Sequence, residues 1–133
     1  MKTILLILPL LFAISCSEDD IQENNELNAS WNLVKYEPGH FAEIYDYTDE
    51  IKWTFNTDNT VDVVIEDGTN VSDYLPLNLS GNYPFSSANE LITLPNIDGD
   101  ESYFYEIQNN ELILSTLAGV NGDGIKITFN ENE

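Results

Sequence analysis

Apolar and polar residues alternate along much of the chain beyond residue 29, with the period of two that is typical of half-buried strands. In IKWTFN, residues 51–56, the large side chains of Ile51, Trp53 and Phe55 fall on one side. The same alternation recurs in segments at residues 31–36, 60–66, 89–94, 102–108, 111–116 and 124–130. The pattern predicts antiparallel strands with one face in a core and the other in solvent.

Short links rich in Asn, Asp and Gly separate these segments. Asn109 and Asn110 lie between two of them and predict a two-residue hairpin turn, because Asn tolerates the left-handed backbone that such a turn requires. Residues 71–87 are less regular, and Pro76 and Pro84 limit this region to one short strand. The total is about eight strands, and none of the folded region shows sustained helical periodicity.

We expect an all-β fold, an up-and-down antiparallel barrel of about eight strands, because a closed meander leaves no exposed sheet edge. A β-sandwich is the alternative. The longest early connection, residues 37–50, carries Phe41, Ile44, Tyr45 and Tyr47 and is too apolar for a loop in solvent. We expect this connection to fold over one end of the barrel.

The N-terminal region has the layout of an export signal. Lys2 precedes an apolar run from Ile4 to Ile14, which is shorter than the roughly 20 residues needed to cross a bilayer. Small side chains flank the last apolar residue and lead directly into Cys16, the only cysteine of the chain. A lone thiol in an exported protein has no partner within the chain for a disulfide.

The sequence A-I-S-C at residues 13–16 resembles the lipobox of bacterial lipoproteins, although a leucine is more usual where Ala13 stands. The resemblance implies that residues 1–15 are a lipoprotein signal peptide that is removed, and that Cys16 carries palmitate-type acyl chains. Two or three such chains hold a protein stably at a membrane. The alternative is an ordinary secretory signal followed by an incidental cysteine.

Residues 16–28 are interpreted as the lipidated cysteine and an acidic tether, since SEDDIQENNELN has few large apolar residues. Ser17 to Asp20, SEDD, resembles the short acidic signal that sends Bacteroidota-type lipoproteins to the cell surface. The resemblance implies a lipid-anchored protein of the outer membrane, displayed on the cell surface. The alternative is that these acids only solvate the linker. Residues 29–133 then form the barrel domain.

The charge of the chain is strongly unbalanced, with 24 acidic residues against four lysines, no arginine and a net charge of −20. Such a chain cannot assemble the basic patch that nucleic acids require. It also lacks guanidinium groups for bidentate recognition of phosphate. We expect the charge to keep a monomeric domain soluble, with the anchor on Cys16 as its only membrane contact.

Several segments are similar to the lipocalin-like domains of small Bacteroidota lipoproteins. They are ASWNLVKY at residues 29–36, IKWTFNTDNTVDV at 51–63, YFYEIQNNELILS at 103–115 and GIKITFN at 124–130. The resemblance implies a barrel whose long first loop overhangs its open end. The chain departs from classical lipocalins because Ala29 replaces a glycine, no arginine is present to pack over Trp31, and no helix follows the last strand.

The inward-facing aromatic residues give a candidate ligand site. Trp53, Phe55, Tyr103 and Tyr105 would line a cavity in which hydroxyl groups orient a small apolar ligand. The alternative is a core filled by these rings, because an eight-stranded barrel is just wide enough for either. With a filled core we expect a non-enzymatic surface interaction module that contacts a protein or a glycan.

Catalytic and metal-binding patterns are weak. His40, the only histidine, lies in the long loop without a cysteine partner or a nucleophile motif, so we expect no enzyme. Asp98 and Asp100 around Gly99, and NGDG at residues 121–124, concentrate oxygen ligands, but neither segment matches a calcium-binding EF-hand loop. A hairpin turn is the simpler interpretation, and we expect neither a metal nor a cofactor.

Overall fold

The computed structural model describes residues 26–40, 42–116 and 124–133, and the regular structure in these ranges is all β. No helix in this part of the chain has the length and apolar character needed to span a membrane. The strands, in chain order, are β1 (Ser30–Glu37), β2 (Tyr45–Asp46), β3 (Ile51–Phe55), β4 (Thr60–Ile65), β5 (Gly81–Pro84), β6 (Ser86–Ala88), β7 (Leu91–Asn96), β8 (Gly99–Gln108), β9 (Glu111–Ser115) and β10 (Lys126–Glu131).

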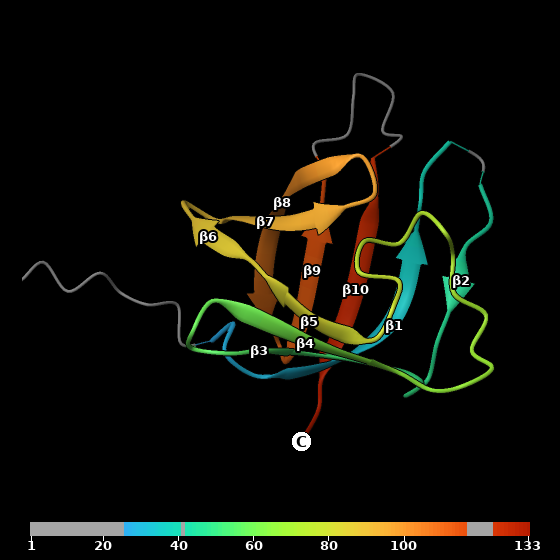
Figure 1. Cartoon of the computed structure of the whole chain (residues 1–133), viewed down its shortest axis with the longest axis horizontal. Coiled ribbons are helices and arrows are strands. Elements are labelled where there is room, and N and C mark those ends of the chain that lie inside the picture. The colour runs from blue at the N-terminus through green and yellow to red at the C-terminus, as the bar shows by residue number, and fades with distance from the viewer. Residues whose placement is uncertain (1–25, 41, 117–123) are drawn as a thin grey trace, which may run out of the picture.

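The strands form one antiparallel sheet that curls into a nearly closed barrel (Figure 1). Its order is β5-β4-β3-β1-β10-β9-β8-β7-β6, and β2 pairs with β1 outside this path. Only Phe85 separates β5 from β6, and the two strands together form one bent segment of the barrel wall. Its first half, β5, pairs with β4, and its second half, β6, pairs with β7. Each continuous segment of the wall is here called a stave. The nine strands on the path therefore make eight staves, and the predicted up-and-down barrel is confirmed.

The inner faces of the staves form a single hydrophobic core, as the alternation predicts. Opposite residues of paired strands bring large groups together, for example Trp31 with Trp53 and Leu112 with Phe129. The buried set is Leu27, Trp31, Leu33, Tyr36, Ile51, Trp53, Phe55, Val61, Val63, Leu75, Leu77, Phe85, Ile92, Leu94, Tyr103, Leu112, Leu114, Ile127 and Phe129.

A β-bulge in β1 changes which side chains face the core. The register with β10 shifts between Leu33 and Lys35, so one extra residue enters the strand. Strict alternation from Trp31 would place Tyr36 on the outer face, whereas the bulge leaves Tyr36 fully buried. Its hydroxyl group can therefore reach a loop at the end of the barrel.

One end of the barrel, here called the terminal end, holds the first and last described residues. The β3–β4, β6–β7 and β8–β9 turns also lie there, as the strand registers require. Trp31 Nε1 donates a 3.1 Å hydrogen bond to the carbonyl oxygen of Leu27, which fixes the entering chain across this end. Asn109 and Asn110 have φ values of 53° and 61°, which confirms the predicted hairpin turn.

The opposite end, here called the loop end, carries the connections from β1 to β3, from β4 to β5 and from β7 to β8. Residues 70–79, the closing loop, cover it: Leu75 and Leu77 are only 2% and 6% exposed. The expectation that residues 37–50 would cover this end was wrong for the described part of that segment. Residues 42–44 are exposed, and Tyr45–Asp46 pair with β1 as β2, which holds this connection beside the barrel. Phe41 lies outside the described residues.

Candidate functional site

Three of the four aromatic residues predicted to bind a ligand lie in the packed core. Trp53 and Tyr103 are 0% exposed and Phe55 is 2% exposed, so their rings have almost no surface in contact with water. The ring of Trp53 lies 5.0 Å from that of Phe129, and the ring of Phe55 lies 5.1 Å from that of Phe85. These separations are those of favourable aromatic pairs. The rings fill the interior of the barrel.

Tyr105, two residues beyond Tyr103 on β8, is less buried than the other three and lies toward the terminal end. It is partly buried, and its backbone N–H donates a 2.9 Å hydrogen bond to the carbonyl oxygen of Glu90. It borders an open groove of about 480 Å³ lined by Glu26, Glu90, Phe104, Tyr105, Glu106, Ile107, Ile113 and Ser115. The structure therefore does not bring the four residues together around one cavity.

A polar cluster lies inside the loop end of the barrel. Glu101 Oε2 accepts a 2.7 Å hydrogen bond from the Tyr103 hydroxyl group and a 2.6 Å hydrogen bond from Asn96 Nδ2. Burial raises the pKa of Tyr103, and its bond to Glu101 raises it further. Burial, reinforced by the charge of Glu101, also raises the pKa of Tyr36 to about 12. Both tyrosines therefore remain neutral hydrogen-bond donors at physiological pH.

Three tyrosine hydroxyl groups hold the closing loop in place. Tyr36 donates to the carbonyl oxygen of Tyr74 at 3.0 Å. Tyr47 donates to that of Asn70 at 3.2 Å, and Tyr83 to that of Leu79 at 2.7 Å. The three donors belong to β1, to the β2–β3 connection and to β5. The loop is thus fastened to the barrel wall on several sides.

The closing loop contains one unfavourable backbone conformation. Leu77 has a φ of 54°, a left-handed value that costs a residue with a branched side chain about 1–2 kcal/mol. Its side chain is buried in the core cluster, and that burial offsets the cost. A 3.1 Å hydrogen bond from Asn78 Nδ2 to the carbonyl oxygen of Asp73 closes the loop on itself. The loop is a compact cover for the barrel end.

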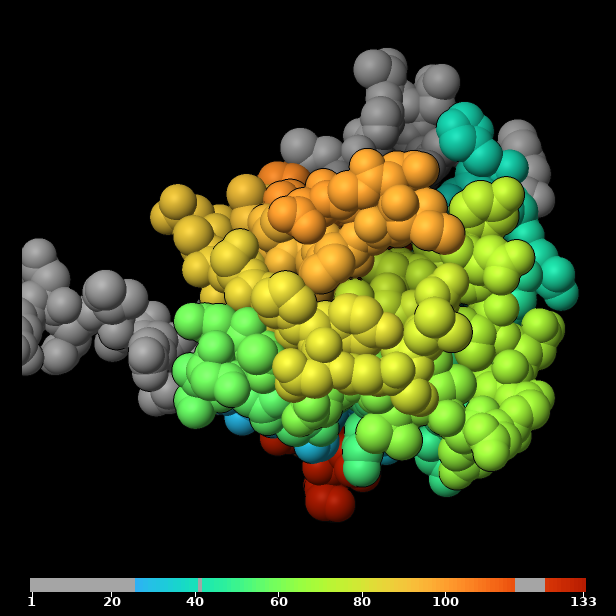
Figure 2. Space-filling model, in the orientation of Figure 1, coloured from blue at the N-terminus to red at the C-terminus, as the bar shows by residue number. Residues whose placement is uncertain are grey.

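A shallow apolar groove, here called the loop-end groove, runs beside the closing loop. Its volume is about 200 Å³, and it is lined by Asp73, Leu75, Leu77, Asn78, Leu79, Tyr83, Pro95, Asn96 and Ile97. Figure 2 looks onto this region, where β5 and the closing loop lie beneath the turn between β7 and β8. Ile97 is 82% exposed, Tyr74 79% and Leu79 69%, so large apolar groups reach solvent here.

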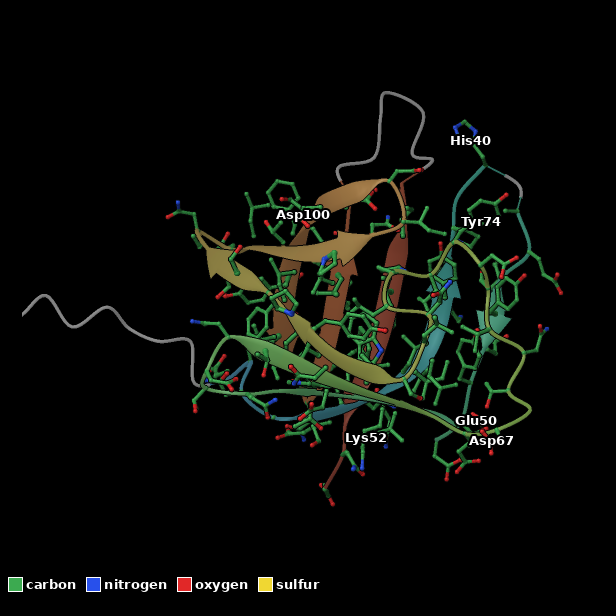
Figure 3. All side chains as sticks on the ribbon, in the orientation of Figure 1. His40, Glu50, Lys52, Asp67, Tyr74 and Asp100 are labelled. Atoms are coloured by element: carbon green, nitrogen blue, oxygen red, sulfur yellow. The ribbon has the colours of Figure 1, made fainter. Side chains whose placement is uncertain are left out.

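A second face of the loop end is acidic. An open groove of about 480 Å³ between β2 and the chain after β4 is lined by Glu43, Ile44, Tyr45, Asp46, Tyr47, Glu50, Glu66, Asp67, Gly68, Thr69 and Asn70. Glu50 and Asp67 lie close to each other in Figure 3. The backbone N–H of Thr48 donates to Glu50 Oε2 at 2.6 Å and lowers the pKa of that carboxyl group.

The remaining candidate residues are spread over the molecule. Asp98 lies in the two-residue turn between β7 and β8, and Asp100 pairs with Pro95 in the same hairpin. His40 is exposed at the loop end, near Tyr74 in the view of Figure 3. In the described ranges no three His, Cys, Asp or Glu side chains gather so that they could hold a metal ion. Cys16 and residues 121–123 lie outside those ranges.

No protein-family model matches the chain, and no curated protein sequence matches it.

Proposed function

We propose that this protein is a lipid-anchored, non-enzymatic binding module of the outer membrane that contacts a macromolecular partner through its loop end. One observation carries the proposal: large aromatic side chains pack the barrel interior, while Leu79 and Ile97 expose large apolar groups at the loop-end groove. Exposed apolar groups gathered on a polar surface are typical of interaction sites. The rest of the proposal follows from the sequence and from the placement of the two ends.

The orientation of the barrel supports this proposal. The chain enters the fold at the terminal end, where Leu27 packs into the core. A lipid on Cys16 would therefore connect to the end opposite the loop-end groove. The net charge of −20 adds repulsion from anionic lipid head groups, within the screening length of about 8 Å. The groove would then face away from the membrane, toward the cell exterior if the protein is displayed there.

The anchor has a direct test. We expect the mature N-terminal peptide to begin at Cys16 and to carry acyl chains, as measured by mass spectrometry of membrane fractions. The variant Cys16→Ser should leave the membrane fraction. An unmodified Cys16 in a membrane-bound protein would contradict the anchor.

The binding end is tested by photo-crosslinking in the cells that produce the protein. A benzophenone amino acid replaces Ile97, which is 82% exposed at the loop end, or Val64, which is 54% exposed on the outer face of β4. We expect a macromolecular adduct from position 97 and none from position 64. Adducts from position 64 alone would contradict a binding role for the loop end.

A second candidate function is storage or transport of a small apolar ligand, and one observation favours it. Trp53 Nε1 is buried and has no hydrogen-bond partner among the described residues. An apolar molecule with one acceptor atom could satisfy this N–H if the closing loop moved and withdrew Leu75 and Leu77. Titration with a naphthylamine dye, followed by quenching of tryptophan emission, tests this candidate. We expect no quenching for the closed barrel, and saturable quenching would favour ligand storage.

A further inference from the structure

The loop-end groove has the size of a pocket for one side chain rather than that of a small-molecule site. Its volume is about 200 Å³, below the roughly 300–1,000 Å³ of typical small-molecule pockets. Figure 2 shows the surface hollowed between the closing loop and the turn that joins β7 to β8. Protein interfaces commonly seat a large anchoring side chain of the partner in such a pocket. The groove therefore suits one long side chain of a partner protein.

Most of the groove lining is apolar. Leu75 and Leu77 are buried and form its floor, whereas Leu79 and Ile97 are exposed and form its rim. The ring of Tyr83 is fixed in the lining, because its hydroxyl group donates a 2.7 Å hydrogen bond to the carbonyl oxygen of Leu79. Long basic side chains bury their aliphatic stems against surfaces of this kind. A guanidinium group can in addition stack on an aromatic ring.

The charge at the groove is negative. Asp73 is exposed in the lining, and Asp98 lies in the adjoining turn between β7 and β8. Glu101 accepts hydrogen bonds from Tyr103 and from the lining residue Asn96, and both donors are neutral, so these bonds do not cancel its charge. The lysines of the described ranges lie on β1, β3 and β10, and none of them lines the groove. A positively charged partner group is therefore attracted.

We propose that the loop-end groove receives an arginine side chain of a partner protein. The aliphatic stem would lie against Leu77, Leu79 and Ile97, and the guanidinium group would meet the carboxylate of Asp73 and the ring of Tyr83. Arginine suits this groove better than lysine, because its planar group stacks on rings, pairs with a carboxylate through two hydrogen bonds and is weakly hydrated. This inference rests on the proposed function, since it specifies which side chain the loop end binds.

The probe is the amide of Nα-acetylarginine, titrated into isotope-labelled protein and followed by nuclear magnetic resonance. The protein carries Cys16→Ser, so that no lipid is attached. We expect saturable shifts of the backbone N–H signals of residues 73, 77–79 and 96–97, with a dissociation constant on the order of 1 mM for a ligand of this size. The citrulline analogue has nearly the same shape without the charge and should bind at least about threefold more weakly. The lysine analogue keeps the charge without the planar group and should also bind more weakly.

Matched variants locate the site. Asp73→Asn removes the carboxylate at the groove, and we expect it to weaken arginine binding about three- to fivefold. Asp67→Asn removes an exposed carboxylate from the acidic groove beside β2 and should leave the binding unchanged. Leu79→Ala shortens the rim and should weaken binding about two- to threefold, whereas Val64→Ala on the outer face of β4 should not weaken it. Circular dichroism of each variant checks that the barrel is intact.

Three results would overturn the inference. They are the absence of groove shifts at concentrations that saturate a millimolar site, binding of the citrulline or lysine analogue as tight as that of the arginine analogue, and an effect of Asp67→Asn as large as that of Asp73→Asn. The proposed function fails separately, when crosslinking in cells gives no adduct from the loop end. A glycan adduct at position 97 would reject the arginine partner and leave the loop end as the binding face.

Discussion

The hydroxyl group of Tyr36 donates a 3.0 Å hydrogen bond to the backbone carbonyl oxygen of Tyr74, 38 positions further along the chain. This bond joins the first stave of the barrel to the loop that covers its end. It exists because the bulge in β1 turns Tyr36 inward, so a local irregularity of one strand determines how the barrel is closed.

Removing this hydroxyl group should loosen the closing loop. We expect Tyr36→Phe to lower the free energy of unfolding by about 1 kcal/mol and to speed hydrogen exchange of the amides in residues 70–79. Tyr74→Phe is the matched control, because Tyr74 accepts through its backbone and its side chain is 79% exposed. Equal effects of the two variants, measured by urea unfolding, would show that the bond does not hold the loop.

Alkaline pH should destabilise the fold. The pKa of Tyr36 is raised to about 12 in the folded protein, whereas an unfolded tyrosine ionises near pH 10. The unfolded state therefore holds fewer protons between these values, and the free energy of unfolding falls as pH rises through this window. Below about pH 10 the contribution of Tyr36 is complete. Tyr103, whose pKa is also raised by burial, acts in the same direction.

Urea unfolding at about pH 9 and about pH 11 measures this loss. We expect the loss to be smaller in Tyr36→Phe and in Tyr103→Phe than in the parent protein. The control Tyr74→Phe should lose as much stability as the parent. A parent protein whose stability does not change over this interval would contradict the buried, neutral placement of both tyrosines.

Two leucines of the closing loop, Leu75 and Leu79, should respond differently to truncation. Leu75 is 2% exposed and inserts into the core, so Leu75→Ala should cost about 2–5 kcal/mol through lost burial and a cavity. Leu79, 69% exposed at the groove, should change stability by about 0.5 kcal/mol or less when replaced by alanine. Thermal or urea unfolding of both variants checks this contrast. If Leu79→Ala lowered the free energy of unfolding strongly and Leu75→Ala did not change it, the loop would not cover the barrel.

The contribution of the β8–β9 hairpin turn to stability should depend on whether residue 110 can adopt a left-handed backbone. Asn110 has a φ of 61°, so Asn110→Ala should lower the free energy of unfolding by about 1 kcal/mol. Asn110→Gly should not lower it, because glycine adopts this conformation without steric cost. Thermal unfolding distinguishes the two, and a more stable alanine variant would be inconsistent with the left-handed turn.

Much of the fold could be predicted from alternation. The pattern in Ile51, Trp53 and Phe55 gives β3 and its buried face, and the same reasoning locates most of the other staves within a few residues. Alternation failed at β1, where the bulge puts Tyr36 on the buried face. It also failed at β6, because Ser86–Ala88 has no large side chains to show a period. Bulges and small-residue edge strands depend on pairing partners that a local pattern does not contain.

The loop end was harder to predict. Leu75, Leu77 and Leu79 already alternate in the sequence, but the first two are buried and the third is exposed. Pro76 obscured this segment, because proline argues against a regular strand. The polar cluster around Glu101 joins Asn96 of β7 to Tyr103 of β8, and the alternation within either strand does not reveal it. Tertiary contacts, rather than local periodicity, build the surface on which the proposals rest.

Native mass spectrometry of the protein purified from its own cells tests the central claim most directly. A filled barrel anchored through Cys16 should have the mass of a mature polypeptide with acyl chains on that residue. The measured mass should be the same before and after the protein is unfolded in the instrument. An additional small molecule that leaves only on unfolding would contradict the account, because it would show that the interior of the barrel holds a ligand.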